Sequence, residues 1–174
     1  MDGTSHGRTL RPGREFLDEA RAILAGERAR LAALLAGEHE LVLVGGSSLP
    51  DTLTKGDVDL HLRVPAEDFG PAVIALRGIY QVVRPEIWQD SLATFAVPAA
   101  LPAGVAVTPV GSEHDLRFRR SWQLLATHPE LVEAYNATKL KYRDLPDLYE
   151  RHKSAFFDLL LADHSARSRE WWRL

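Results

Sequence analysis

The chain has 174 residues, of which 45% are hydrophobic and 26% are charged, and its formal net charge is −3 at pH 7. This length and composition are typical of one globular domain with a sizeable core, and the slightly acidic balance gives no strong signal for a nucleic-acid partner. The sequence contains no cysteine, which excludes disulfides, thiol nucleophiles and cysteine-ligated zinc. No apolar run approaches the ~20 residues of a membrane span. We therefore expect no membrane partner and, by default, a cytoplasmic location.

The first part of the chain predicts an arm, a helix and two strands. Residues 1–12 are polar and contain glycine, which predicts a flexible arm ahead of a single domain at residues 13–162. Apolar residues recur at helical spacing over residues 14–35. A short apolar run at residues 41–44 predicts a buried strand. Residues 57–64 alternate strictly between polar and apolar side chains, which predicts a strand with one buried face.

The second part of the chain predicts a further helix, more strands and then a helical segment. The expected helices cover residues 66–77, 112–127, 129–143 and 147–162, and the expected strands cover residues 80–83, 91–97 and 105–110. Residues 163–174 are predicted to form a C-terminal tail, which contains two adjacent tryptophans. The fold class that follows is α+β, an α/β sandwich in which a mixed sheet of four to five strands is flanked by helices and followed by a C-terminal helical segment.

A glycine-serine turn directly after the strand at residues 41–44 is one half of the most informative motif. It consists of Gly45, Gly46, Ser47 and Ser48. Such a turn brings backbone N–H groups and hydroxyls close to a phosphate, which predicts a nucleotide-binding role for these residues. Glycine and serine are also ordinary turn residues, so the prediction depends on what lies beside the turn.

The other half of the motif is a pair of carboxylates, Asp57 and Asp59, spaced i, i+2 on the expected strand. This spacing puts both side chains on one face, and Mg²⁺ prefers one or two carboxylates together with phosphate oxygens. The pair is therefore the candidate for metal ligands and catalytic groups, the alternative being a solvated strand face. Lys55 is a candidate phosphate contact. His61 shares the face of the two acids and is a candidate substrate-binding group, although we favour a hydrogen-bonded histidine at the edge of the cleft.

The chain resembles a known family in two segments. An apolar residue, Gly, Gly or Ser, about ten residues and then Asp-x-Asp resembles the signature of the nucleotidyltransferase superfamily, which has the DNA polymerase β-like fold. Within it, residues 45–60 are similar to the GrpB family, matching its pattern at Gly45, Ser48, Pro50, Lys55 and Asp59. Residues 116–139 (LRFRRSW…HPELVEAYNATK) and 149–156 (YERHKSAF) are similar to the family's C-terminal pattern.

The resemblance implies a nucleotidyltransferase that uses Mg²⁺ (or Mn²⁺) and an NTP, with ATP as the expected nucleotide, and an unidentified acceptor. It also implies substrate-binding positions on the C-terminal helices, at Arg119, Lys139, Tyr149 and Lys153. A catalytically inactive nucleotide-binding or protein-interaction module on the same fold remains the alternative, and a homodimer is left open.

A missing acid motivates this alternative. The superfamily supplies a third carboxylate from a later strand, and residues 105–110 contain none. Asp90 is the best remaining candidate for that carboxylate and Glu86 a weaker one.

Overall fold

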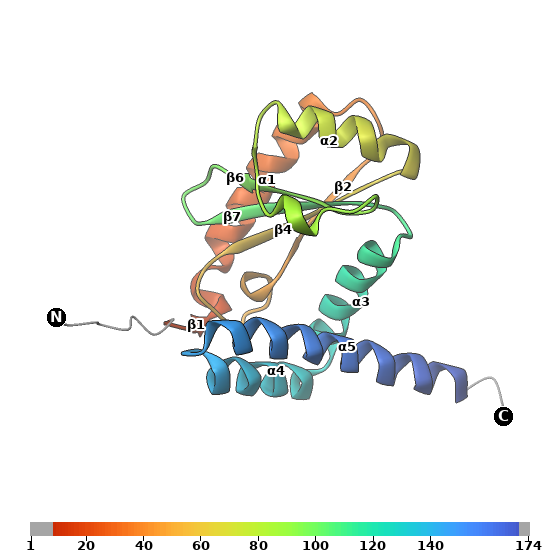
Figure 1. Cartoon of the computed structure of the whole chain (residues 1–174). Coiled ribbons are helices and arrows are strands. Elements are labelled where there is room, and N and C mark those ends of the chain that lie inside the picture. The colour runs from red at the N-terminus through yellow and green to blue at the C-terminus, as the bar shows by residue number, and fades with distance from the viewer. Residues whose placement is uncertain (1–8, 171–174) are drawn as a thin grey trace.

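A five-stranded mixed sheet separates two groups of helices in the computed structural model, which describes residues 9–170 (Figure 1). Helices α1 (Leu17–Leu34) and α2 (Phe69–Arg77) cover one face of the sheet. The chain then passes through α3 (Glu113–Thr127) to α4 (Pro129–Tyr142) and α5 (Pro146–Glu170), which lie side by side beyond the other face. This arrangement confirms the predicted α+β fold with a C-terminal helical segment.

The strand order of the main sheet is β2-β4-β7-β6-β5. Its strands are β2 (Glu40–Val44), β4 (Val58–Val64), β5 (Gln81–Val82), β6 (Ala93–Val97) and β7 (Ala103–Pro109). Strand β4 pairs in parallel with β7, whereas β2–β4, β6–β7 and β5–β6 are antiparallel. The central pair β4–β7 places Asp59 beside Gly104 and His61 beside Ala106.

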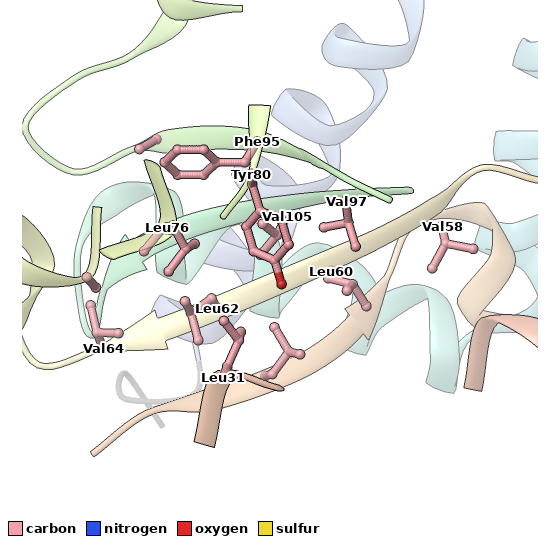
Figure 2. Packing of buried hydrophobic residues seen from close by; sticks show 14 of the residues in the cluster. Leu31, Val58, Leu60, Leu62, Val64, Leu76, Tyr80, Phe95, Val97 and Val105 are labelled. Carbon is pink, nitrogen blue, oxygen red and sulfur yellow. The ribbon is translucent and has the colours of Figure 1, made fainter. Parts of the chain in front are cut away.

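The alternation of β4 decides which face of the sheet is the core. Val58, Leu60, Leu62 and Val64 are each at most 1% exposed and pack with residues of α1, α2 and the neighbouring strands (Figure 2). The side chains between them therefore point to the opposite face, toward α3, α4 and α5. The predicted division of this strand into an apolar and a polar face is confirmed.

The C-terminal helices form a second, smaller apolar cluster. Leu125, Val132 and Tyr135 are its buried members, and Trp122 and Phe157 pack against them. Helix α3 begins at the N-cap Ser112, whose hydroxyl accepts the backbone N–H of Asp115 at 3.3 Å, and Pro129 opens α4 as predicted.

Several boundaries differ from the prediction. Residues 11–12, predicted to belong to the arm, form strand β1 (Arg11–Pro12), which pairs with β3 (Leu53–Thr54). Short 3₁₀ turns occur at Gly13–Glu15, Gly46–Ser48, Ala66–Asp68 and Pro85–Ile87. Helix α5 continues past residue 162 to Glu170, and the two adjacent tryptophans, Trp171 and Trp172, lie outside the described residues. No helix among residues 9–170 has the length and hydrophobicity needed to cross a bilayer.

Candidate functional site

A pocket of about 530 Å³ lies between the polar face of the sheet and the three C-terminal helices. Its volume is within the range of small-molecule sites in proteins. One part of its wall is charged and comes from the start of β4, the turn after β2, and helices α4 and α5. The lining residues of this part include Gly45, Gly46, Thr54, Lys55, Asp57, Asp59, Lys139, Tyr149, Glu150 and Lys153. The pocket therefore unites, from distant parts of the sequence, most of the residues that the motif and the resemblance singled out.

Gly45 allows the Asp59 carboxylate to lie directly against the turn. Its backbone angles, φ 77° and ψ −176°, belong to a region that essentially only glycine populates. A Cβ atom at this position would stand 2.0 Å from Oδ2 of Asp59. At Gly46, a Cβ would stand 2.8 Å from Cβ of Thr54 and 3.4 Å from Nζ of Lys139. Both glycines are therefore required for the close approach of site groups to the backbone.

The two serines of the turn do not line the pocket, although they were predicted to bind the nucleotide together with the two glycines. Ser47 is buried, and its hydroxyl donates to the backbone carbonyl of Asp57 at 2.5 Å. The hydroxyl of Ser48 donates to the carbonyl of Gly45 at 2.6 Å. Neither residue is part of the pocket wall. Ser47 instead ties the turn to the strand that carries the acids.

Asp57 and Asp59 both line the pocket, as predicted from their spacing. Oδ1 of Asp57 accepts the hydroxyl of Thr54 at 3.3 Å, and its Oδ2 lies 3.3 Å from Nζ of Lys55. Asp59 is exposed to the solvent of the pocket, but protein encloses it on its other sides. This burial, and then the negative charge of Asp57, raise the pKa of Asp59 to about 6. A cation between the two carboxylates would relieve their repulsion.

Lys139 on α4 is a buried ammonium next to these acids, only 4% exposed. Its Nζ donates to the backbone carbonyl of Leu53 and lies 4.2 Å from the centre of the Tyr135 ring. Burial, and then the charge of Lys153, lower the pKa of Lys139 to about 7, although both aspartates act in the opposite direction. A buried ammonium with one hydrogen bond has donors left for an anionic ligand.

Helix α5 adds a second lysine to the same wall. Nζ of Lys153 lies 3.2 Å from a carboxylate oxygen of Glu150 and 5.3 Å from the centre of the Tyr149 ring. Together with Lys55 and Lys139, it surrounds the two aspartates with three lysines. Lys139, Tyr149 and Lys153, which were predicted from the resemblance, are thus placed in the pocket.

Arg119 and His61 are the remaining predicted site residues. Arg119 is exposed and outside the pocket wall, whereas Arg117 on the same helix is part of it. His61 is fully buried, and its Nε2 lies 2.8 Å from the hydroxyl of Thr108. Burial lowers the pKa of His61 to about 4, so that the imidazole is neutral near pH 7. The ring is therefore a hydrogen-bonded histidine at the edge of the cleft.

Helix α4 also holds the loop that precedes Asp57, a contact that the sequence analysis did not predict. The side-chain carbonyl of Asn136 accepts the backbone N–H of Leu53 at 2.7 Å, and its amide donates to the carbonyl of Asp51 at 2.8 Å. Glu150 and Thr54 were missed as lining residues as well. The hydrogen bonds of Asn136 join residues more than 80 positions apart, so no local sequence pattern predicts them.

Strand β7 carries no acidic residue, although it is the strand from which the sequence analysis expected the superfamily's third carboxylate. The β7 residues beside Asp59 and His61 are Gly104 and Ala106. Asp90 and Glu86 are not part of the pocket wall. Within residues 9–170 no group of three or more histidine, cysteine, aspartate or glutamate side chains is placed to hold a metal ion. Among the residues that the structure describes, the aspartate pair is the candidate metal-binding group.

Known structures share the fold of this chain. The crystal structure of the conserved protein GrpB from Enterococcus faecalis is similar over 88% of this chain and 99% of its own, with a TM-score of 0.63 and 14% sequence identity. The chain has the GrpB fold. At this identity the likeness concerns the fold, which agrees with the family resemblance of the sequence. No family model matches the sequence, and no curated protein matches it.

The Cid1 poly(U) polymerase is also similar, over 75% of this chain. A mutant bound to MgATP gives a TM-score of 0.51 at 14% identity, and a complex with the short product ApU gives 0.50 at 15%. The chain spans about two fifths of these polymerases, 42% and 41% of their lengths. The fold is therefore nucleotidyltransferase-like, as the sequence predicted.

Proposed function

We propose that this chain is a metal-dependent nucleotidyltransferase that binds Mg²⁺ and a nucleoside triphosphate in the pocket and transfers the nucleotidyl group to an acceptor. The observation that carries this proposal is the meeting of three features in one pocket. These are the Asp57–Asp59 pair, the side-chain-free turn at Gly45–Gly46 and the buried ammonium of Lys139. The MgATP-bound polymerase of similar fold supports it.

The donor set fits a metal ion that arrives with a nucleotide. Mg²⁺ binds proteins through one or two carboxylates and completes its shell with water and phosphate oxygens. Asp57 and Asp59 supply such a pair, and the raised pKa of Asp59 comes first from its burial and then from the negative charge of Asp57. When bound, the ion would neutralise charge on the transferring phosphate. Mn²⁺ accepts the same oxygen ligands.

The remaining lining residues act on the phosphates. Gly45 and Gly46 have no side chains to keep a phosphate from the backbone, and a Cβ on either would collide with site groups. Lys139 and Lys153 approach from the opposite wall and would balance the charge of the leaving pyrophosphate. In this arrangement catalysis consists of positioning the nucleotide and neutralising its charge.

A second candidate is a nucleotide-binding module that has lost turnover. The observation in its favour is the β7 strand, whose residues beside Asp59 and His61 are Gly104 and Ala106. Without a carboxylate there, this chain has no acid on β7 to activate an acceptor. A module of this kind would bind Mg²⁺–nucleotide as strongly as an enzyme would.

The first prediction removes one carboxylate. Asp59→Asn is expected to weaken Mg²⁺-dependent ATP binding at least about 30-fold, because losing one partner of a close charge pair costs about 2 kcal/mol or more. Calorimetric titration with ATP, in Mg²⁺ and in EDTA, measures this. Asp90→Asn is the matched control, since that acid lies outside the pocket wall and should leave the affinity unchanged.

Pyrophosphate release separates the two candidates. With cell extract as the source of acceptor, release that is lost in Asp59→Asn and retained in Asp90→Asn supports the enzyme. Binding without release in any extract favours the module. Equal ATP affinity in Asp59→Asn and in the unmodified chain rejects both assignments of the pocket.

The second prediction concerns pH. An amine is charged below its pKa, so Lys139, with a pKa of about 7, loses its charge as the pH rises through 7. The contribution of Lys139 to ATP affinity is expected to fall about tenfold between roughly pH 6 and pH 8, which is the value of one charged hydrogen bond. Ionisation of Asp59, whose pKa is about 6, acts in the opposite direction over the same range. The groups that face this amine are Lys153, Asp57, Asp59 and Tyr135.

Titrations across this range in the unmodified chain and in Lys139→Met isolate the contribution of Lys139. The variant should bind ATP more weakly than the unmodified chain below pH 7, and the two affinities should converge as the pH rises. The difference between the two profiles reports Lys139, because the ionisations of Asp59 and of the nucleotide are common to both proteins. Parallel pH profiles of the two proteins would show that Lys139 does not contact the nucleotide.

A further inference from the structure

The end of the pocket away from the aspartate pair contains two buried polar atoms without partners. Nδ1 of His61 and Oγ of Ser121 have no hydrogen bond in the described residues, although both are shielded from solvent. Both residues belong to the pocket wall. Buried polar groups in native proteins are nearly always paired, so two unpaired ones beside one cavity indicate that a ligand supplies the partners.

The surroundings of these atoms include two aromatic side chains, with Arg117 on the same pocket wall and the buried Asp115 carboxylate 3.8 Å from Nε2 of His61. The Phe118 ring lies 5.0 Å from the His61 ring, centre to centre, and Trp122 follows Ser121 on the same wall. Ala106 of β7 leaves space beside His61, because its side chain is a single methyl group. Such a wall suits a planar, uncharged ring with hydrogen-bonding atoms on its edge.

We propose that this end of the pocket is a nucleobase subsite, in which the base lies against Phe118 and Trp122 and its edge bonds to Nδ1 of His61 and Oγ of Ser121. This inference rests on the proposed function, because it takes the triphosphate to lie at the aspartate pair. The spacing agrees with it. Asp59 and His61 are two residues apart on β4, which corresponds to about 6.6 Å along a strand. This separation is comparable to the length of the sugar that lies between the phosphate and the base of a nucleotide.

The subsite explains why the chain tolerates an unpaired hydroxyl. Removing a buried, unpaired hydroxyl stabilises a protein or leaves its stability unchanged, because no hydrogen bond is lost and the cost of desolvating the hydroxyl disappears. Ser121 is 3% exposed and has no partner, so nothing in the ligand-free fold requires it. Ser121→Ala should therefore raise the thermal midpoint of the free chain while weakening the ligand complex.

The test uses inorganic tripolyphosphate as a ligand without a base. The unmodified chain is titrated in Mg²⁺ with tripolyphosphate and with ATP, GTP, CTP and UTP. The best NTP is expected to bind at least tenfold more tightly than tripolyphosphate and about fivefold or more above the worst NTP. In Ser121→Ala the affinity for the best NTP should fall five- to tenfold and the four NTPs should converge, whereas tripolyphosphate affinity stays constant.

Thr52→Val is the matched control. The hydroxyl of Thr52 is likewise buried and unpaired in the described residues, but Thr52 is outside the pocket wall. This variant should gain stability as Ser121→Ala does, with every affinity unchanged.

Each contrary outcome has its own meaning. If tripolyphosphate binds and no NTP binds more tightly, or if Ser121→Ala leaves NTP affinity unchanged, the subsite is overturned and the proposed function stands. If Ser121→Ala weakens tripolyphosphate and NTP equally, the residue acts on the phosphate end and the subsite is again overturned. If neither tripolyphosphate nor any NTP binds in Mg²⁺, the proposed function fails and the subsite with it.

Discussion

Gly45→Ala is expected to abolish Mg²⁺-dependent ATP binding while leaving the chain folded. The new Cβ would stand 2.0 Å from Oδ2 and 2.9 Å from Cβ of Asp59, so the carboxylate has to leave its place against the turn. Backbone strain adds to this, because φ 77° with ψ −176° is a region that costs a residue with a side chain about 1–3 kcal/mol. A single methyl group therefore disturbs the metal-binding pair without removing any charge.

Two measurements distinguish a local effect from unfolding. Chemical denaturation of Gly45→Ala should show a free energy of unfolding lowered by about 1–3 kcal/mol, and calorimetry should show no ATP binding in Mg²⁺. Gly26→Ala is the matched control, since its added Cβ in the middle of α1 would meet no atom within 4 Å apart from its chain neighbours and the backbone of the helix itself. It should gain about 0.5–1 kcal/mol of stability and keep full affinity. Unchanged ATP affinity in Gly45→Ala would contradict the role given to the Asp59 carboxylate at this turn.

The sequence predicted the fold best where one period governs a whole element. The alternation over residues 57–64 specified both β4 and its polar face, because a strand that passes through the core has one buried side. Pro129 and Ser112 marked helix starts for reasons of backbone chemistry alone. The short strands β1 and β3 and the 3₁₀ turn before α2 were not predicted, because so few residues carry no complete period.

Residue spacing alone predicted only the half of the site that is local in sequence, whereas Lys139, Tyr149 and Lys153 were predicted from the family resemblance. Asp57, Asp59 and the glycine turn lie within fifteen residues of each other and form one motif. The helical wall depends on the rotation of α3, where Phe118, Ser121 and Trp122 face the pocket on the side of the buried Leu125. Arg119 is on the other side of that helix. The helical period, counted back from Leu125, would have favoured these three residues over Arg119.

Arg63→Met is expected to be the most destabilising change outside the core. The guanidinium of Arg63 donates to Asp115 through Nε at 2.6 Å and through Nη2 at 3.1 Å, and it also pairs with the exposed Glu40. Asp115, at the start of α3, is fully buried. Removing one partner of a buried ion pair costs about 3–5 kcal/mol, because the other charge stays without compensation. Denaturation measures this cost, and Arg14→Met, which breaks an exposed pair with Asp51, should cost less than about 1 kcal/mol.

A double variant and a pH series locate the cause in the charge of Asp115. Burial raises the pKa of this carboxyl, but the hydrogen bonds from Arg63 and from the backbone N–H of Gly111 outweigh it, so the pKa lies below its ordinary value. A lowered pKa contributes stability that is present above the ordinary value and is lost as the pH falls through the folded one. Arg63→Met should remove much of this acid dependence.

Arg63→Met with Asp115→Asn should recover part of the lost stability, because the unpaired buried charge is gone. Since β4 carries Asp59 and α3 carries the aromatic wall of the pocket, this ion pair holds the two walls together. Equal free energies of unfolding of Arg63→Met and Arg14→Met would show that the connection between β4 and α3 depends on packing alone.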